Sequence, residues 1–388
     1  MDLKAAASSM LGVSYDDVEY FEAFDKFNNN EITGYLCRKR DHRYGALIVI
    51  TVNGHMSVNG PTYCTPKLKY PFGRNEKGDR IPNWPKEIVD VRVYDKLDGT
   101  AVCCYRYLDH LGNTFVTFKT RLSPVLGENS FGDYYGMWCE ILERYPELRS
   151  PREVASGEYT FTYELYGYRN PILIKYPVDL DARLLFAVLQ DWPFDGLVQI
   201  PEKFKQRPLE AVAKADSNES TEVLYESLRV MAEQQNVENS DGSITGREGF
   251  IFYVMAKGHL GYRQYKCKPE GIETVHWENA FIPYYAILTT VWNSLEDVAE
   301  LNRIRVVELL HEDFTAEQIA CSTDRLDRAL DFVSKRLKWR SKVDAAYKKL
   351  PITMDAGRTA VMKKLSEEFP RDRMRDVYNA LRELGHAK

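Results

Sequence analysis

The apolar and polar positions of the chain follow one period before about residue 275 and another after it. In the first part, short segments rich in Val, Tyr, Thr and Phe, several of them alternating apolar with polar residues, predict β-strands. Gly- and Asn-containing pairs such as Asn53-Gly54 separate several of these segments and favour turns. The predicted strands are 44–52, 89–97, 100–108, 113–121, 159–167, 183–191, 249–255 and 262–268.

Helical periods follow in the remainder of the chain. Apolar residues at 326, 330, 333 and 337, and again at 374, 377, 381 and 384, recur every three or four positions, as on one face of an amphipathic helix. Thr315 followed by Gln318 resembles a capping box, and Pro351 and Pro370 mark helix boundaries. We therefore predict a β-rich domain over residues 1–275 and a helical domain over 276–388.

Composition excludes several classes of protein. With 388 residues, 44% hydrophobic and 28% charged, the chain is not disordered, collagen-like or a coiled coil. No apolar run reaches the roughly 18 residues of a membrane span, and residues 1–20 do not resemble a secretory signal. The seven Cys contain no C-x-x-C pattern. We expect no membrane association, no zinc site, no disulfide framework and a location in the reducing cytoplasm.

The net charge of −5 averages two segments of opposite sign. Residues 208–241 carry eight acidic and two basic residues, and apolar positions at helical spacing predict a surface helix there. Residues 335–349 carry seven basic and one acidic residue, interleaved with Trp339 and Tyr347. Such a stretch could bind an RNA backbone and stack on a base, although a solvated helix face explains it equally well.

The sharpest local feature is the segment Lys96-Leu97-Asp98-Gly99-Thr100, which lies between two predicted strands. A lysine followed by Asp and a turn-forming Gly suits a nucleophilic amine. The pKa of a free lysine, about 10.4, would have to be lowered by cations, a metal or burial before the amine could attack. Taken alone, the segment is explained better by a solvated Asp-Gly hairpin.

Three features further along the chain strengthen the case for a reactive lysine. Glu164 lies in an otherwise aromatic strand, where a half-buried carboxylate needs a partner or a ligand. Glu248 stands at the start of another predicted strand. Lys266 and Lys268 share one face of a strand, and two like charges side by side favour an anion such as a polyphosphate. Each feature on its own also fits an outward-facing, solvated strand.

Taken in this order, the K-x-D-G segment, the strand Glu, the E-G pair and the K-x-K pair resemble the motif series of the covalent nucleotidyltransferase superfamily, which comprises DNA ligases, RNA ligases and mRNA capping enzymes. The resemblance covers residues 40–270 and is strongest to bacteriophage-type ATP-dependent RNA ligases of the first type. Residues 44–47 and 65–72 resemble two elements upstream of the nucleophile in that branch. Asn170 and Tyr176 fall at its downstream offsets.

Two positions depart from the branch. Arg43 stands one residue before the place where an Arg-Gly pair is expected, and Arg121 stands where a second lysine is expected after Lys119. The roles of both positions are therefore open.

The resemblance implies an α+β fold, with a nucleotidyltransferase core of antiparallel sheets and flanking helices, residues 1–90 contributing to the nucleotide site, and an all-α carboxy-terminal domain. It implies an ATP-dependent RNA ligase that joins 5′-phosphate and 3′-hydroxyl ends through a lysine–AMP intermediate and an adenylylated RNA 5′ end. Mg²⁺ or Mn²⁺ would assist, and the substrate would be single-stranded RNA or broken tRNA, as in RNA repair. A monomer is expected, located in the host cytoplasm if the chain is phage-encoded.

Roles follow from the same resemblance. Lys96 would attack the α-phosphorus of ATP, Lys266 and Lys268 would hold the α-phosphate, and Phe186 would pack on the adenine unless it is simply a core residue. Glu164 would accept from a ribose hydroxyl, and Glu248 and Asp98 would serve the metal. The expected ATP-binding residues are Lys96, Leu97, Arg43, Lys69, Glu164, Phe186, Glu248, Lys266 and Lys268. The expected RNA-binding residues are Asp98, Lys119, Arg121, Lys338, Arg340 and Lys342.

Three alternatives remain open. A DNA ligase or a capping guanylyltransferase would share the same core, although both usually carry a β-barrel where this chain predicts helices. A non-catalytic RNA-binding protein could retain a decayed ligase core, although such a core tends to lose its nucleophile first.

Overall fold

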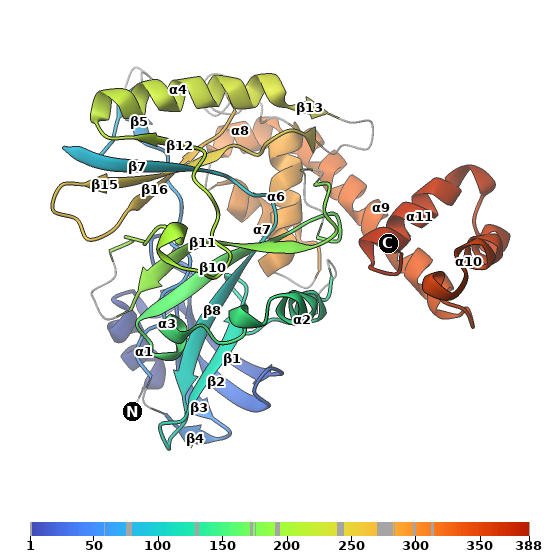
Figure 1. Cartoon of the computed structure of the whole chain (residues 1–388), viewed down its shortest axis with the longest axis horizontal. Helices are drawn as coiled ribbons and strands as arrows, with labels where there is room; N and C mark the ends of the chain where they lie inside the picture. Colours follow the sequence, from blue (N-terminus) through green and yellow to red (C-terminus); the bar gives the residue numbers. More distant parts are fainter. Residues whose placement is uncertain are drawn as a thin grey trace.

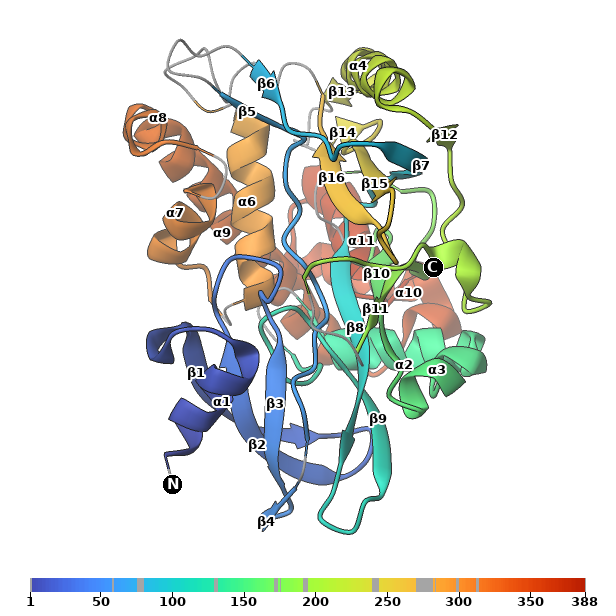
Figure 2. The same ribbon diagram turned by 90° about the vertical axis from the view of Figure 1, so that its left-hand side faces the viewer.

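The computed structural model describes residues 2–57, 59–74, 80–128, 132–170, 174, 176–190, 195–238, 244–269, 282, 284–297, 300–311 and 314–387. In this described part, three four-stranded sheets form the body of the molecule, and every pairing within them is antiparallel. Figures 1 and 2 show the sheets with helices around them and a helical arm to one side. The predicted combination of antiparallel sheets and helices is confirmed.

The first sheet is a meander of β1 (Val18–Asp25), β2 (Asn30–Cys37), β3 (Leu47–Val52) and β4 (His55–Met56). Helix α1 (Leu3–Leu11) packs against it, because Ala7 and Leu11 bury their side chains with Val18 and Ile48. The Asp2 side chain caps the helix, and Gly12 ends it in a left-handed conformation at φ 64°. The sequence patterns singled out β3 but neither β1 nor β2.

The second sheet has the order β11-β10-β8-β9. Its strands are β8 (Thr100–Leu108), β9 (Thr114–Lys119), β10 (Tyr159–Tyr166) and β11 (Asp181–Leu189). Helices α2 (Tyr134–Arg144) and α3 (Arg152–Ala155) pack on it, with Trp138 fully buried against Phe161 and Tyr163. The first and last residues of these strands differ from those of the predicted segments by at most two positions.

The third sheet has the order β12-β7-β15-β16. Its strands are β7 (Ile88–Asp95), β12 (Ala213–Ala215), β15 (Phe250–Ala256) and β16 (Arg263–Cys267). Two small hairpins also occur: β5 (Phe72–Arg74) with β6 (Arg80–Pro82), and β13 (Val237–Glu238) with β14 (Ile244–Thr245).

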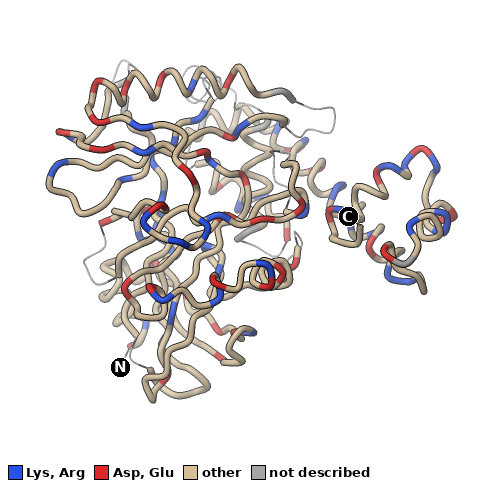
Figure 3. Tube along the Cα trace, viewed as in Figure 1, with Lys and Arg blue, Asp and Glu red and all other residues tan. Residues whose placement is uncertain are grey.

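The predicted acidic helix is α4 (Asn218–Gln235), and it is part of the body of the protein as well as of its surface. Its buried Tyr225 and Ala232 pack with Phe252 and Val93 of the third sheet. Acidic positions recur along the backbone of this helix in Figure 3. The helix is therefore the outer cover of the sheet, and the acidic residues occupy its solvent side.

Beyond residue 282 every described regular element is helical. The α-helices are α6 (Tyr284–Asp297), α7 (Arg303–Leu310), α8 (Ala316–Cys321), α9 (Thr323–Lys348), α10 (Met354–Glu368) and α11 (Met374–Glu383). Thr315 and Gln318 form the predicted capping box of α8. Short 3₁₀ turns lie at Tyr15–Asp17, Pro146–Leu148, Pro201–Lys203 and Arg371–Arg373. The predicted domain boundary at 275/276 lies outside the described residues and stays a prediction.

Hydrophobic packing divides the helices differently from the sequence pattern. Apolar residues of α6, α7, α8 and the first half of α9, up to Val333, belong to the same core as the second sheet. The second half of α9, from Val343, packs with α10 and α11 in a separate core. Figure 1 accordingly shows α10 and α11 at the end of an arm that α9 extends from the body. In the described part of the chain, no helix combines the length and apolar character that a membrane span requires.

Candidate active site

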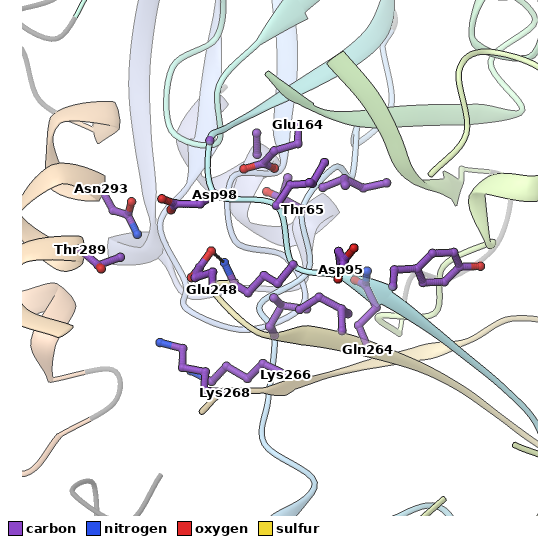
Figure 4. A pocket seen from close by; sticks show the side chains of 18 of the residues that line it. Thr65, Asp95, Asp98, Glu164, Glu248, Gln264, Lys266, Lys268, Thr289 and Asn293 are labelled. Atoms are coloured by element: carbon purple, nitrogen blue, oxygen red, sulfur yellow. Dashed lines mark hydrogen bonds and ion pairs between the residues drawn. The ribbon is translucent and has the colours of Figure 1, made fainter. Parts of the chain in front are cut away.

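A cavity of about 260 Å³ lies among the second sheet, the third sheet and helix α6 (Figure 4). It brings together side chains that are far apart in the sequence, from the β7–β8 connection, β10, β11, β15 and β16. The sequence-predicted site residues that line it are Lys96, Leu97, Asp98, Arg121, Glu164, Phe186, Glu248, Lys266 and Lys268.

Lys96 occupies the point where the chain leaves the third sheet for the second. Its backbone N–H donates to the carbonyl oxygen of Gly249 over 2.9 Å, which continues the β7–β15 ladder by one residue. This pairing sets Lys96 beside Glu248, and the Lys96 ammonium forms an ion pair with the Glu248 carboxylate. Gly249 is needed here because its φ is +142° and a Cβ atom would lie 2.3 Å from the carbonyl oxygen of Cys267.

The turn after Lys96 is held from the second sheet. Asp98 is 3% exposed; its Oδ2 accepts from the N–H of Ile174 over 2.7 Å, and its own N–H donates to the Tyr176 hydroxyl over 2.7 Å. A Cβ on Gly99 would lie only 2.2 Å from the carbonyl oxygen of Leu165, which explains the glycine. The turn is thus a buried, supported connection rather than a solvated hairpin.

Asn170, in the turn that follows β10, supports the same segment. Its amide nitrogen donates to the carbonyl oxygen of Leu165 over 2.7 Å and to the Thr100 hydroxyl over 3.1 Å. Asn170 and Tyr176, which the resemblance singled out by their offsets, therefore hold the segment that follows Lys96 in place.

The remaining motif residues reach the cavity from their strands. Glu164, 8% exposed, pairs with Ala101 on β8. Lys266 pairs with Ile251 on β15, and its ammonium lies 4.3 Å from the centre of the Tyr70 ring. Lys268 follows β16 and lines the same cavity (Figure 4).

The charge of Lys96 is set by competing effects. Burial by itself would lower the pKa of its amine, but the neighbouring Glu248, and then Glu164 and Asp98, raise it above the ordinary value for lysine. The lysine is therefore an ammonium ion at neutral pH. A nucleophilic role requires that other cations satisfy these carboxylates first.

The cavity has a charged end and an apolar end. Asp98, Glu248 and Lys268 lie at the charged end, whereas Phe186 and Ile251 line the cavity from an apolar cluster between β11 and β15. Phe186 is 6% exposed and belongs both to this cluster and to the cavity wall. The two interpretations of Phe186 from the sequence, a core residue or a base-packing residue, are thus compatible.

Helix α6 adds a wall that the sequence analysis missed. Ala286, Thr289, Thr290 and Asn293, which share one helix face, line the cavity, while Val291 and Trp292 are buried in the core. Thr289 and Asn293 lie on the side of Asp98 and Lys268 in Figure 4. The sequence does contain a signal for this wall, because polar residues recur three and four positions apart in an otherwise apolar helix.

Other cavity residues also lacked a role in the sequence analysis. Thr65 and Lys67 come from the segment noted upstream of the nucleophile. Arg247, which precedes β15, forms an ion pair with Asp95. Gln264 of β16 lines the cavity two residues before Lys266.

Two of the expected ATP-binding residues, Arg43 and Lys69, do not line this cavity. Arg43 forms an ion pair with Asp41 and donates to the carbonyl oxygen of Gly12, which ties its loop to α1. Lys69 lines a neighbouring cavity of about 510 Å³ that shares Lys67 and Gln264 with the first. Contacts of Arg43 and Lys69 with ATP stay predictions.

Lys119 and Arg121, both predicted to contact RNA, differ in placement. Lys119 is fully buried, and its ammonium donates to three backbone carbonyl oxygens, of Gly45, Thr120 and Arg121, over 2.8–3.1 Å. This placement leaves no surface for RNA and gives the lysine a structural role. Arg121 does line the cavity, with its guanidinium 5.7 Å from the centre of the Tyr44 ring.

The basic residues of α9 that were predicted to contact RNA also differ in their exposure. Lys338 and Lys342 are exposed, as a solvated or RNA-facing surface requires. Arg340 is 6% exposed and lies 3.8 Å from a carboxylate oxygen of Glu383, so it joins α9 to α11 instead. The structure thus brings Lys338 and Lys342, but not Arg340, to the surface.

The cavity suits a divalent cation bound together with a nucleotide. Among the described residues, no three His, Cys, Asp or Glu side chains are grouped closely enough to form a complete metal site. Mg²⁺, however, is usually held by one or two carboxylates together with substrate phosphates and water. Glu248 and Asp98, both lining the cavity, fit that arrangement.

No family model and no curated protein sequence matches the chain. Among solved structures it is similar to two forms of an archaeal ATP-dependent RNA ligase, at 12% and 13% identity and TM-scores of 0.43 and 0.45, over 89% of this chain and 83% of each ligase chain. It is also similar to a putative ATP-dependent DNA ligase from Aquifex aeolicus, at 16% identity and a TM-score of 0.40, over 92% and 86% of the two chains.

Proposed function

We propose that the chain is an ATP-dependent nucleic-acid ligase that forms a lysine–AMP intermediate on Lys96 and joins the 5′-phosphate and 3′-hydroxyl ends of RNA. The observation that carries this proposal is the convergence of Lys96, two glutamates and two lysines in one cavity. A buried Glu164 and a largely covered Glu248 beside the partly exposed Lys96 are costly unless a ligand uses them, and Lys266 and Lys268 supply the positive charge that a phosphate needs.

The first step fits the layout of the cavity. The Lys96 amine would attack the α-phosphorus of ATP, form an N–P bond and release pyrophosphate. Lys266 and Lys268 would neutralise the charge on the α-phosphate as the leaving group departs, which is the main contribution that a protein makes to phosphoryl transfer. Glu164 would accept a hydrogen bond from a ribose hydroxyl, with the base at the apolar end near Phe186.

Glu248 would have two successive roles. In the free protein it holds the Lys96 ammonium. Glu248 and the phosphates of ATP would together bind a divalent cation, Mg²⁺ or Mn²⁺. The cation would compete with the Lys96 ammonium for the Glu248 carboxylate, and its positive charge would lower the pKa of the Lys96 amine. Asp98, buried at the charged end, would assist in the later steps.

The later steps would use the same phosphate-binding lysines. AMP would pass from Lys96 to an RNA 5′-phosphate, giving a 5′–5′ pyrophosphate linkage, and an RNA 3′-hydroxyl would then displace AMP. The exposed lysines of α9 extend positive charge outside the cavity, which supports a nucleic-acid substrate. Single-stranded RNA or broken tRNA, in an RNA-repair role, is the substrate that we propose.

The first test is incubation with α-labelled ATP and Mg²⁺, followed by a denaturing gel. We expect label on the protein, its absence in Lys96→Ala, and unchanged labelling in Lys364→Ala, which removes an exposed lysine of α10. Label from GTP alone would instead indicate a capping guanylyltransferase. A wild-type protein that takes no label from either nucleotide would contradict catalysis and favour the RNA-binding alternative.

A second test separates RNA from DNA. A 5′-phosphorylated single-stranded RNA, the same sequence as DNA, and a nicked DNA duplex are offered to the labelled protein. We expect circularised RNA and little product from either DNA. Sealing of the nicked duplex with no RNA product would identify a DNA ligase.

A further inference from the structure

One buried polar atom at the apolar end of the cavity has no partner. The side chain of Gln264, on β16, is 9% exposed and lines the cavity. Its Oε1 atom is buried and accepts no hydrogen bond within the described part of the chain. Buried amide oxygens are nearly always hydrogen-bonded, so this atom requires an explanation.

The neighbours of Gln264 fix the direction of its amide. Gln264 pairs with Tyr253 across β15 and β16, so the two side chains share a face. The Tyr253 hydroxyl donates to the carbonyl oxygen of Leu185 over 3.0 Å, and its oxygen is therefore left as an acceptor. Burial raises the pKa of the Tyr253 phenol, and a hydrogen bond from Gln264 opposes that rise. The amide nitrogen thus faces Tyr253, and Oε1 is the end left for a ligand.

The position of Gln264 matches the place of a base rather than that of a phosphate. Leu185, Phe186 and Ile251 are apolar residues in the wall of the same cavity. Figure 4 shows Gln264 on one side of the cavity and Asp98 and Lys268 toward the other. A nucleotide with its phosphates at Lys268 would direct its base toward Gln264.

We infer that Gln264 recognises the 6-amino group of adenine and makes this cavity select ATP over nucleotides with a 6-oxo group, an inference that rests on the proposed function. The adenine N6–H group is a donor that can satisfy Oε1. Guanine and hypoxanthine present an oxygen there, so two acceptors would face each other. Turning the amide over would only set Oε1 against the Tyr253 oxygen, because that oxygen also accepts.

The test compares rates of adduct formation from α-labelled ATP, inosine triphosphate and purine riboside triphosphate, which carry an amino group, an oxygen and no group at position 6. For the wild type we expect ATP to be favoured over inosine triphosphate by about 10- to 100-fold, the range that one unsatisfied buried hydrogen-bonding group produces. Purine riboside triphosphate should fall between the two.

Three variants locate the effect. Gln264→Leu should bring the ratio of ATP to inosine triphosphate within about threefold, because an apolar side chain of similar size removes the acceptor. Gln264→Glu keeps an acceptor and should retain a preference for ATP. Gln234→Ala, which removes an exposed amide of α4, should leave the ratio at the wild-type value. Each ratio is measured on one preparation, so a loss of folded protein cancels.

The outcomes separate this inference from the proposed function. Adduct formation with a wild-type ratio near one, or a full ratio in Gln264→Leu, would overturn the role of Gln264 and leave the ligase intact. A wild type that forms no adduct with any of the three nucleotides would overturn both.

Discussion

The chemistry of single residues in the cavity depends on the charge of Lys96. Its side chain is partly buried, which alone would lower the pKa of the amine, yet Glu248, Glu164 and Asp98 together raise that pKa and keep the amine protonated in the free protein. A nucleophilic lysine requires a lowered pKa, and the sequence does not show that carboxylates surround Lys96. Under the proposed function, ATP and a cation must therefore redistribute these charges before Lys96 can attack.

Glu248→Gln tests this account at the residue scale. Removing the carboxylate removes a cause that raises the Lys96 pKa, so burial should lower it and the fraction of free amine should increase. An amine-acylating reagent at pH 8 without ATP, read by peptide mass spectrometry, should modify Lys96 several-fold faster in Glu248→Gln than in the wild type. The exposed Lys363 in the same digest is the internal standard, and Glu367→Gln, which removes the carboxylate beside the exposed Lys364, is the matched variant. Slower or equal modification of Lys96 would contradict the account.

At the scale of elements, strands were predictable where side chains alternate and helices where apolar residues recur every three or four positions. The segments that contain β7, β8, β10, β15 and β16, which carry the site, were all recognised. Strands β1 and β2 were not assigned. The burial of β1 does not alternate strictly, and its exposed positions include the aromatic Tyr20 and Phe24, so the period of two that identifies a strand is obscured.

Helix α4 shows what composition could not reveal. Its acidic surface indicated an exposed insertion, but Tyr225 is 3% exposed against the third sheet and its hydroxyl donates to the backbone carbonyl oxygen of Lys266 over 3.3 Å. The helix therefore supports β16, the strand that carries Lys266.

Tyr225→Ala should consequently lower the free energy of unfolding by about 3 kcal/mol, because it opens a cavity beneath the sheet. Val223→Ala on the opposite, exposed face should change it by less than about 0.5 kcal/mol. Urea titration of both variants measures these values. Equal small effects would show that α4 does not stabilise the sheet.

At the scale of the whole molecule, two cores meet within α9. The sequence pattern placed one boundary before all the helices because it detects the period of an element and not its packing partner. The packing instead makes α6 part of the body, where it lines the cavity, and leaves α10 and α11 to a distal core.

Matched variants in the two cores should behave differently. Trp292→Ala, in the core that α6 shares with the second sheet, should lower the thermal midpoint of the body and reduce formation of lysine–AMP. Phe369→Ala, in the distal core, should destabilise the arm and leave adduct formation at the wild-type rate. Calorimetry and the adduct assay on both proteins provide the readouts. Loss of adduct in Phe369→Ala would show that the arm is needed for the first step.

The sequence predicts some of the residues that line the cavity and not others, because only some of them belong to short motifs. Lys96, Glu164, Glu248, Lys266 and Lys268 belong to short motifs whose order is visible in the chain. Gln264 and the α6 face reach the cavity through strand register and helix packing, which arise only when distant segments fold together.

The most direct measurement of the central claim is the site of AMP attachment. The protein is incubated with ATP and Mg²⁺, digested at neutral pH, and its peptides are sequenced by mass spectrometry. The account predicts AMP joined to the amine of Lys96, lost on treatment with acid, and absent when pyrophosphate is added in excess. AMP on another residue, or no AMP on any peptide while Lys96 is covered, would contradict it.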